Sequence, residues 1–161
     1  MLWRVSKVEI SRLVYLKELK GSLSLATLPS GLPEWVDDDE ALARFLTSSS
    51  QFNSLMVKPT AFLPNPKNGE TSVFRHAAEP RDALWEIGAA YVVGDRTLHG
   101  AAVFKARHVR EVGLEVKAHE PPPRHANIVD WPAAGLDQQM IRAEQKERAL
   151  VIAQFAELVC R

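Results

Sequence analysis

This chain of 161 residues has little cysteine and no long apolar run, and its single cysteine is Cys160. One cysteine excludes an intramolecular disulfide framework and a cysteine-rich zinc site. No stretch reaches the roughly 20 apolar residues that a membrane-spanning helix needs. Charged residues interrupt residues 1–28, which leaves no apolar segment for a signal peptide. These absences predict a soluble protein with no membrane partner, and a reducing cytoplasm is its simplest location.

An excess of charge of one sign is also missing. The 20 lysines and arginines balance the 20 aspartates and glutamates, so the net charge at pH 7 is zero. A protein that holds a phosphate backbone usually carries a basic excess or a basic stripe. Residues 105–124 do hold a group of basic side chains, but Glu111, Glu115 and Glu120 lie among them and aromatic residues for base stacking are scarce. Nucleic acid is therefore not favoured as a partner, although a local patch stays open.

Motifs that bind nucleotides or activate a nucleophile are absent as well. Gly88, Gly94 and Gly100 are widely spaced, so neither a GxGxxG loop nor a Walker-type phosphate loop occurs. The serine run at residues 48–50 has no Gly-x-Ser-x-Gly pattern around it. The sequence therefore predicts no cofactor, and no known motif identifies a nucleophile.

The chain does contain enough apolar material for one globular domain. Hydrophobic residues make up 46% and charged residues 25%, which is ordinary for a folded protein. A domain of this size buries roughly two thirds of the surface of its unfolded chain. We predict a single domain over residues 1–161, with residues 1–36 as a candidate N-terminal extension. Pro29, Gly31 and Pro33 give the end of that segment the composition of an irregular connection.

Two segments in the first third of the chain carry helix start signals. Asp37 can cap the amide of Glu40 while Glu40 reaches back, which predicts a helix over about residues 37–46. Residues 7–20 also follow a capping box. Their apolar residues fall almost all round a helix, however. Periodicity therefore does not choose between a buried helix, a partner-facing helix and a strand around residues 14–16.

Two more helices and one short turn are predicted further along. Pro80 in the first turn and Gly94 just past the end predict a helix over about residues 81–92. Residues 136–159 contain no glycine or proline, and the second half of this segment has a broad apolar surface. They predict a long C-terminal helix. A single helical turn is expected at residues 106–112.

A small, mainly antiparallel sheet is expected to pack with these helices. Asn68 and Gly69 can adopt the positive φ values of a hairpin loop, so a hairpin over about residues 57–75 is predicted. Further strands are predicted over about residues 98–105 and 112–119, the second from its alternation of apolar and polar side chains. This order of helices and strands is typical of an α+β domain.

Residues 119–132 read HEPPPRHANIVDWP and include two histidines close together. The opening is superficially like the HExxH zinc motif, in which a helix brings two imidazoles to one face. Three prolines lie between His119 and His125, and prolines break a regular helix, so a zinc protease is not predicted. A metal site of the two histidines with Glu120 or Asp130 stays open on geometry, but the spacing is weak support and no metal is predicted.

Two interpretations of this segment remain. In one, His125 is the catalytic candidate, because the pKa of an unperturbed histidine lies near neutrality. Arg124 or Arg75 would then hold an anionic group, and Asn127 would orient a water or a substrate carbonyl. In the other, which is favoured, His125 and Asn127 bond the backbone of an irregular loop and Trp131 anchors that loop to the core. The candidate ligand-binding residues are Arg124, Asn127, Arg75 and Trp131.

The stretch from about Val57 to Pro132 resembles a group of small bacterial proteins of unassigned function. The phrases that carry the resemblance are VKPTAFLP, SVFR, WEIG and, most distinctively, PPRHANI. It covers about half of the chain and leaves out residues 1–56 and the final helix. Because the group has no assigned activity, cofactor or partner, the resemblance implies no role for any residue here.

Two functional hypotheses follow from these observations. The first is an intracellular binding or accessory module that acts through protein contacts, with a partner or self-association surface in residues 1–20 or 136–159. It is favoured because no complete catalytic constellation is visible. The second is a metal-independent hydrolase or nuclease-like enzyme centred on His125, with arginines that hold an anion. Convergence of His125 and Arg75 in a cleft would favour the enzyme, and a His125 ring bonded to backbone would count against it.

Overall fold

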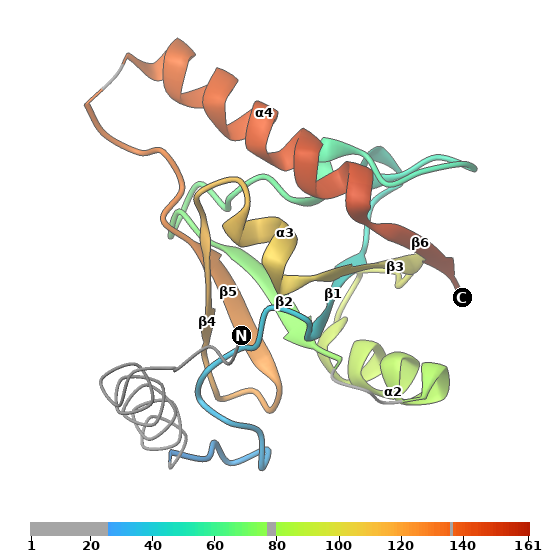
Figure 1. Ribbon diagram of the computed structural model, residues 1–161. Coiled ribbons are helices and arrows are strands. Elements are labelled where there is room, and N and C mark those ends of the chain that lie inside the picture. The colour runs from blue at the N-terminus through green and yellow to red at the C-terminus, as the bar shows by residue number, and fades with distance from the viewer. Residues whose placement is uncertain (1–25, 77–79, 136) are drawn as a thin grey trace, which may run out of the picture.

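The computed structural model describes residues 26–76, 80–135 and 137–161, and in these ranges six antiparallel strands form one sheet (Figure 1). Across the sheet the strands follow the order β4, β5, β2, β1, β3, β6. Their bounds are Ala41–Leu46 for β1, Thr71–Arg75 for β2, Gly100–Lys105 for β3, Glu115–Ala118 for β4, His125–Val129 for β5 and Glu157–Cys160 for β6. The predicted α+β class with an antiparallel sheet is confirmed.

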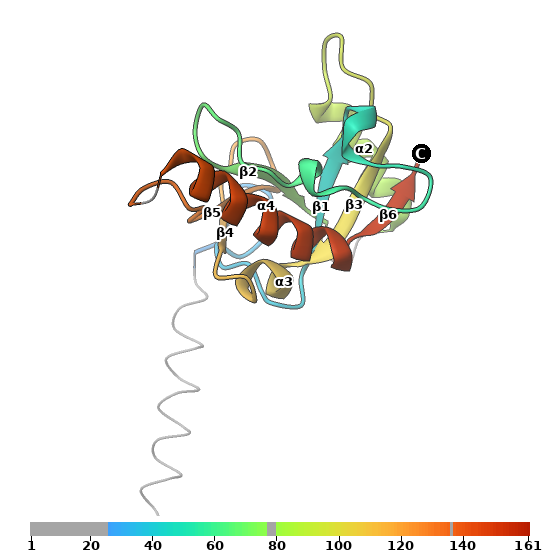
Figure 2. The ribbon, with the colours of Figure 1, turned by 90° about the horizontal axis from the view of Figure 1, so that it is seen from above.

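Helices pack on both faces of this sheet (Figure 1 and Figure 2). The long helix α4 (Gln138–Phe155), the short helix α3 (Ala106–Arg110) and the 3-10 turn η2 (Pro59–Ala61) cover one face, where they enclose the larger apolar core. The helix α2 (Arg81–Tyr91) lies on the other face over a smaller apolar cluster. Trp131 is 6% exposed and belongs to the larger core.

Residues 41–46 form the strand β1 instead of the predicted helix. Leu42 lies in the core under α4, whereas Phe45 lies in the cluster under α2, so both sides of this short segment are buried. A short apolar run that is buried on both sides has no periodicity that separates a strand from a helix. The carboxylate of Asp37 caps no helix either. It accepts a hydrogen bond of 2.9 Å from the amide of Asp39, as in an Asx turn.

The predicted hairpin over residues 57–75 is wrong in its first strand. β2 forms at residues 71–75, but it pairs with β1 and β5. The earlier segment forms the turn η2, because Pro59 has no amide hydrogen for a strand ladder and its fixed φ suits a first helical turn. Gly69 has a φ of 72°, so this glycine does supply the positive φ that was expected in the connection.

The elements α2, α3, β3 and β4 occupy the segments predicted for them, but the C-terminal helix is shorter than predicted. α4 ends at Phe155, and residues 157–160 form β6 at the edge of the sheet beside β3. Gly100 on β3 permits this close pairing, because a Cβ atom there would lie 2.7 Å from the carbonyl oxygen of Val159.

The helix or strand expected within residues 7–20, and most of the candidate extension over residues 1–36, lie outside the described residues. Within the described ranges, none of the helices combines the length and the apolar character that crossing a membrane requires.

Candidate functional site

Strand β5 places His125 and Asn127 on one face of the sheet, where an irregular loop was expected. Alternate residues of a strand point to opposite faces, and Ala126 and Ile128 lie in the core under α4. His125 and Asn127 therefore point to the face opposite α4. The strand register pairs Asn127 with a serine of β2 and with a lysine of β4. We call the resulting group the polar face, and it consists of Glu70, Ser72, Lys117, His119, His125 and Asn127.

A serine and a histidine are in direct contact on the polar face. The hydroxyl oxygen of Ser72 lies 2.7 Å from Nε2 of His125. The other ring nitrogen of His125, Nδ1, lies 2.8 Å from the main-chain oxygen of His119. Because a carbonyl oxygen only accepts, Nδ1 carries the proton and donates it to His119. Nε2 of His125 is then free to accept the hydroxyl proton of Ser72.

Burial keeps this histidine in its neutral form. Desolvation lowers the pKa of His125 below its usual value of 6.5, and the nearby His119 lowers it further. The bond to the His119 carbonyl and the carboxylate of Glu70 oppose this shift but do not reverse it. The rings of His119 and His125 meet edge to face, with centroids 5.3 Å apart, and the His119 side chain is the exposed one. His125 is therefore uncharged at neutral pH.

The side chain of Asn127 is buried and bonded to another side chain of the protein. It is 5% exposed, and its amide nitrogen donates a 2.6 Å hydrogen bond to the carboxylate of Glu70. The proposed role of Asn127 in orienting a water or a substrate carbonyl stays a prediction. In this structure the amide fixes the Glu70 carboxylate at the side of the polar face.

Arg75 does not join His125. It follows Phe74, the residue opposite His125, so its side chain points to the other face of the sheet. There it is 1% exposed and forms two charge-assisted hydrogen bonds with Glu40, of 2.6 and 2.7 Å. Its guanidinium also donates to the main-chain oxygen of Pro33. Arg75 therefore ties the segment before β1 to the sheet, and the anion-holding role predicted for it has no support from this geometry.

The loop between β4 and β5 is organised by Glu120. Its carboxylate accepts hydrogen bonds from the amide of Arg124 at 2.8 Å and from the amide of Ser30 at 3.0 Å. Burial would raise the pKa of Glu120, but these hydrogen bonds outweigh it and lower the pKa. Arg124 itself adopts a φ of 66°. Glu120 is thus engaged with the main chain, and the described residues contain no group of three or more potential metal ligands.

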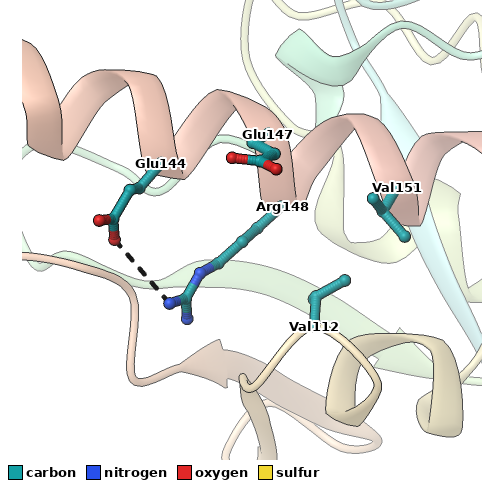
Figure 3. A pocket seen from close by; sticks show the side chains of 5 residues that line it. All are labelled: Val112, Glu144, Glu147, Arg148 and Val151. Atoms are coloured by element: carbon teal, nitrogen blue, oxygen red, sulfur yellow. Dashed lines mark ion pairs between the residues drawn. The ribbon is translucent and has the colours of Figure 1, made fainter.

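A shallow hollow lies on the α4 side of the molecule, away from the polar face (Figure 3). It is lined by Val112 from the turn after α3 and by Glu144, Glu147, Arg148 and Val151 from α4. Glu144 and Arg148 form an ion pair across 3.9 Å. The hollow therefore has mixed charge, and it contains no histidine, serine or cysteine that could act on a substrate.

Sequence reasoning missed a second unusual surface, the loop at residues 53–56. Leu55 is 84% exposed and Met56 is 57% exposed. The loop is nevertheless rigidly built, because the side-chain oxygen of Asn53 accepts hydrogen bonds from the amides of both residues, at 2.8 and 2.9 Å. An isolated bridge between Phe52 and Val57 closes its base. We call this loop the apolar tip. A signal for it was present, since residues 47–57 contain no charged side chain.

The C-terminal helix also exposes apolar side chains, but they do not form one stripe. Met140, Leu150 and Phe155 are each about half exposed. At a rise of 1.5 Å per residue, Met140 lies about 15 Å along the axis from Leu150, and Leu150 and Phe155 lie about 140° apart around it. The ring of Phe155 is further occupied, because it stacks on His108 with centroids 4.2 Å apart. α4 therefore offers scattered contacts rather than a continuous apolar face.

The fold and this site define an α+β protein with an antiparallel sheet, a polar face on the side of that sheet opposite α4, and an apolar tip at residues 53–56. No family model, no curated protein and no solved structure matches the chain. The resemblance of residues 57–132 to a group of small bacterial proteins stays a prediction.

Proposed function

We propose that this protein is a binding module that recognises a protein partner through the apolar tip. The observation that supports the proposal is that Leu55 and Met56 are exposed while the main chain beneath them is fixed by Asn53. Burying a leucine or methionine side chain yields about 1.5–3 kcal/mol. A loop that is already rigid loses little conformational entropy on binding, so more of the free energy of burial contributes to the affinity.

The surroundings of the tip indicate the chemistry of the partner. The base of the loop is anchored, because Val57 is 2% exposed and the ring of Phe52 packs on that of His99. The rim is polar but uncharged, since residues 47–54 are serines, a threonine, a glutamine, an asparagine and one phenylalanine. A surface of this kind suits an apolar pocket with an uncharged rim on another protein. Residues 47–57 carry no cation for a phosphate backbone or an anionic membrane.

Other surfaces contribute less to this proposal. Residues 136–159 expose the scattered apolar side chains of α4, which fit a supporting contact, and residues 1–20 lie outside the described part of the chain. The alternative hypothesis, a hydrolase or nuclease-like enzyme with arginine anion holders around His125, has less support for two reasons. Arg75 is buried on the opposite face, and Nδ1 of His125 is bonded to the main-chain oxygen of His119, which counts against this enzyme. We also propose a cytoplasmic location, since Cys160 is a free and exposed thiol.

A photo-crosslinking amino acid placed at position 55 tests the proposal in living cells. Position 93 is the matched control, because Val93 is an apolar residue, 60% exposed, in a different loop. We expect an adduct with a partner protein from position 55 and none from position 93. With that partner purified, Leu55→Ser should weaken binding about 30-fold, the loss typical of a binding hot spot. Unchanged affinity, identical adducts at both positions, or an adduct of the chain only with itself would contradict the proposal.

A further inference from the structure

Ser72 and His125 have the geometry of a nucleophile and its general base, which the binding function does not use. The hydroxyl oxygen lies 2.7 Å from Nε2, and the main-chain oxygen of His119 orients the ring from its other side. Contacts of 2.6–3.2 Å between a nucleophile and a base that a third group orients are typical of activated serines. We propose that Ser72 is a reactive nucleophile that accepts the acyl group of an activated ester and releases it to water, with His125 as the base.

The base is in the form that the reaction needs. A histidine accepts a proton only when it is neutral, and burial lowers the pKa of His125. The carbonyl of His119 also selects the tautomer, because it takes the hydrogen on Nδ1 and leaves the lone pair on Nε2 facing Ser72. A charged aspartate usually fills this orienting position in serine hydrolases, and here a backbone dipole does so.

The nucleophile stands on a rigid part of the fold. Ser72 belongs to β2, which pairs with β5 on one side and with β1 on the other. The pairing of β1 with β2 covers only residues 42–43, and the guanidinium of Arg44 bridges the strands next to that region. It donates to the main-chain oxygen of Ser72 at 2.8 Å and to that of Ala61 at 2.9 Å. Sites built on strands hold their geometry better than sites built on loops.

The reaction follows from these positions. The Ser72 oxygen attacks the ester carbonyl carbon while its proton moves to Nε2 of His125. The bond to the alcohol or phenol oxygen breaks, and that oxygen takes the proton from His125, which leaves an acyl group on Ser72. A water molecule then repeats the two steps, with His125 accepting its proton and returning it to the Ser72 oxygen. The products are the free acid and the alcohol, and no electrons are gained or lost. The substrate class is therefore an acyl ester with a good leaving group.

The test uses 4-nitrophenyl acetate as the probe and peptide mass spectrometry as the readout. The chain has its own control, because Ser54 is exposed in the apolar tip, outside the polar face. We expect the acetyl group on Ser72 to form about 100-fold faster than on Ser54, since general base catalysis typically contributes 10²–10⁴-fold. In His125→Gln, acetylation of Ser72 should fall by a similar factor, and in Ser72→Ala the acetylated peptide should be lost.

The pH dependence adds a readout that a purely structural hydrogen bond would not change. Acetylation of Ser72 should rise with pH through the lowered pKa of His125 and level off above it, at a lower pH than an ordinary histidine would give. Equal initial rates of acetylation at Ser72 and Ser54 in the wild type, or an unchanged initial rate at Ser72 in a folded His125→Gln protein, would overturn the proposal. Circular dichroism establishes whether the variant folds. If it does not fold, the ratio of the acetylation rates of Ser72 and Ser54 in the wild type is the test, because that ratio requires no substitution.

Discussion

The polar face and the apolar tip depart from the ordinary distribution of residues in opposite ways. On the polar face, Asn127 is 5% exposed, although asparagine is mostly exposed in folded proteins. At the tip, Leu55 is 84% exposed. In both places hydrogen bonds hold the unusual residue where it is. Buried polar residues and exposed apolar residues that hydrogen bonds hold in place are expected at functional sites.

A third region shows that buried polar groups alone do not mark function. Arg75 is also buried and Glu40 is largely covered, with side chains 1% and 11% exposed, but each satisfies the other in a bidentate pair. The Ser72–His125 contact differs because it joins a hydroxyl to a neutral imidazole on a half-exposed surface. The Arg75–Glu40 pair is therefore structural, whereas the Ser72–His125 pair has the groups that a reaction needs.

Breaking the Arg75–Glu40 pair should produce the largest effect on stability. Glu40→Gln keeps the shape of the side chain but leaves the Arg75 charge buried without a counter-charge. We expect the free energy of unfolding to fall by about 3–5 kcal/mol, as measured by urea denaturation. The matched control is Glu157→Gln, which removes the partner of Arg81 in a pair whose side chains are both 68% exposed. That change should cost less than about 1 kcal/mol. An equal loss of unfolding free energy in the two variants would show that burial does not determine how much these ion pairs stabilise the fold.

The contact between Ser72 and His125 also shows what the sequence was unable to predict. The two residues are 53 positions apart, and Ser72 has no motif around it. Only the pairing of β2 with β5 brings them together. β5 itself was mistaken for a loop because prolines precede it and Pro132 follows it closely. Residues 125–128 do alternate between polar and apolar side chains, but the prolines on both sides led to the prediction of a loop.

Local signals predicted the parts of the fold that local interactions determine. The Pro80 start of α2 and the alternation along β4 identified both elements within a few residues. β1 was predicted as a helix because its strand form depends on neighbours far along the chain that bury both of its sides. The candidate site was predicted only in part for the same reason. His125 was identified by its chemistry, whereas its partner and the opposite orientation of Arg75 follow from sheet register.

A lower pH should reduce the free energy of unfolding in part through His125. This effect should be smaller than that of breaking the Arg75–Glu40 pair. Since burial lowers the pKa of His125 in the folded state, the unfolded chain binds more protons between that pKa and about pH 6.5. The stability of the wild type should therefore decrease as the pH falls from 7.5 to 5, in part through this residue. His125→Gln removes that contribution, so its stability should decrease less over the same interval. Urea denaturation at the two pH values measures the difference, and an equal decrease in both proteins would contradict a neutral, buried His125.

The smallest effect on stability is expected at the apolar tip. Leu55 contributes little to the folded core because most of its side chain is in solvent. The hydrogen bonds that shape the loop come from the side chain of Asn53 and the main chain, which Leu55→Ser leaves in place. The free energy of unfolding should therefore stay within about 0.5 kcal/mol of the wild type, as usual for a surface substitution. Thermal and urea denaturation of the isolated protein measure it. A loss above 1.4 kcal/mol, a tenfold change in the folding equilibrium, would mean that Leu55 packs on the protein itself and is not held out for a partner.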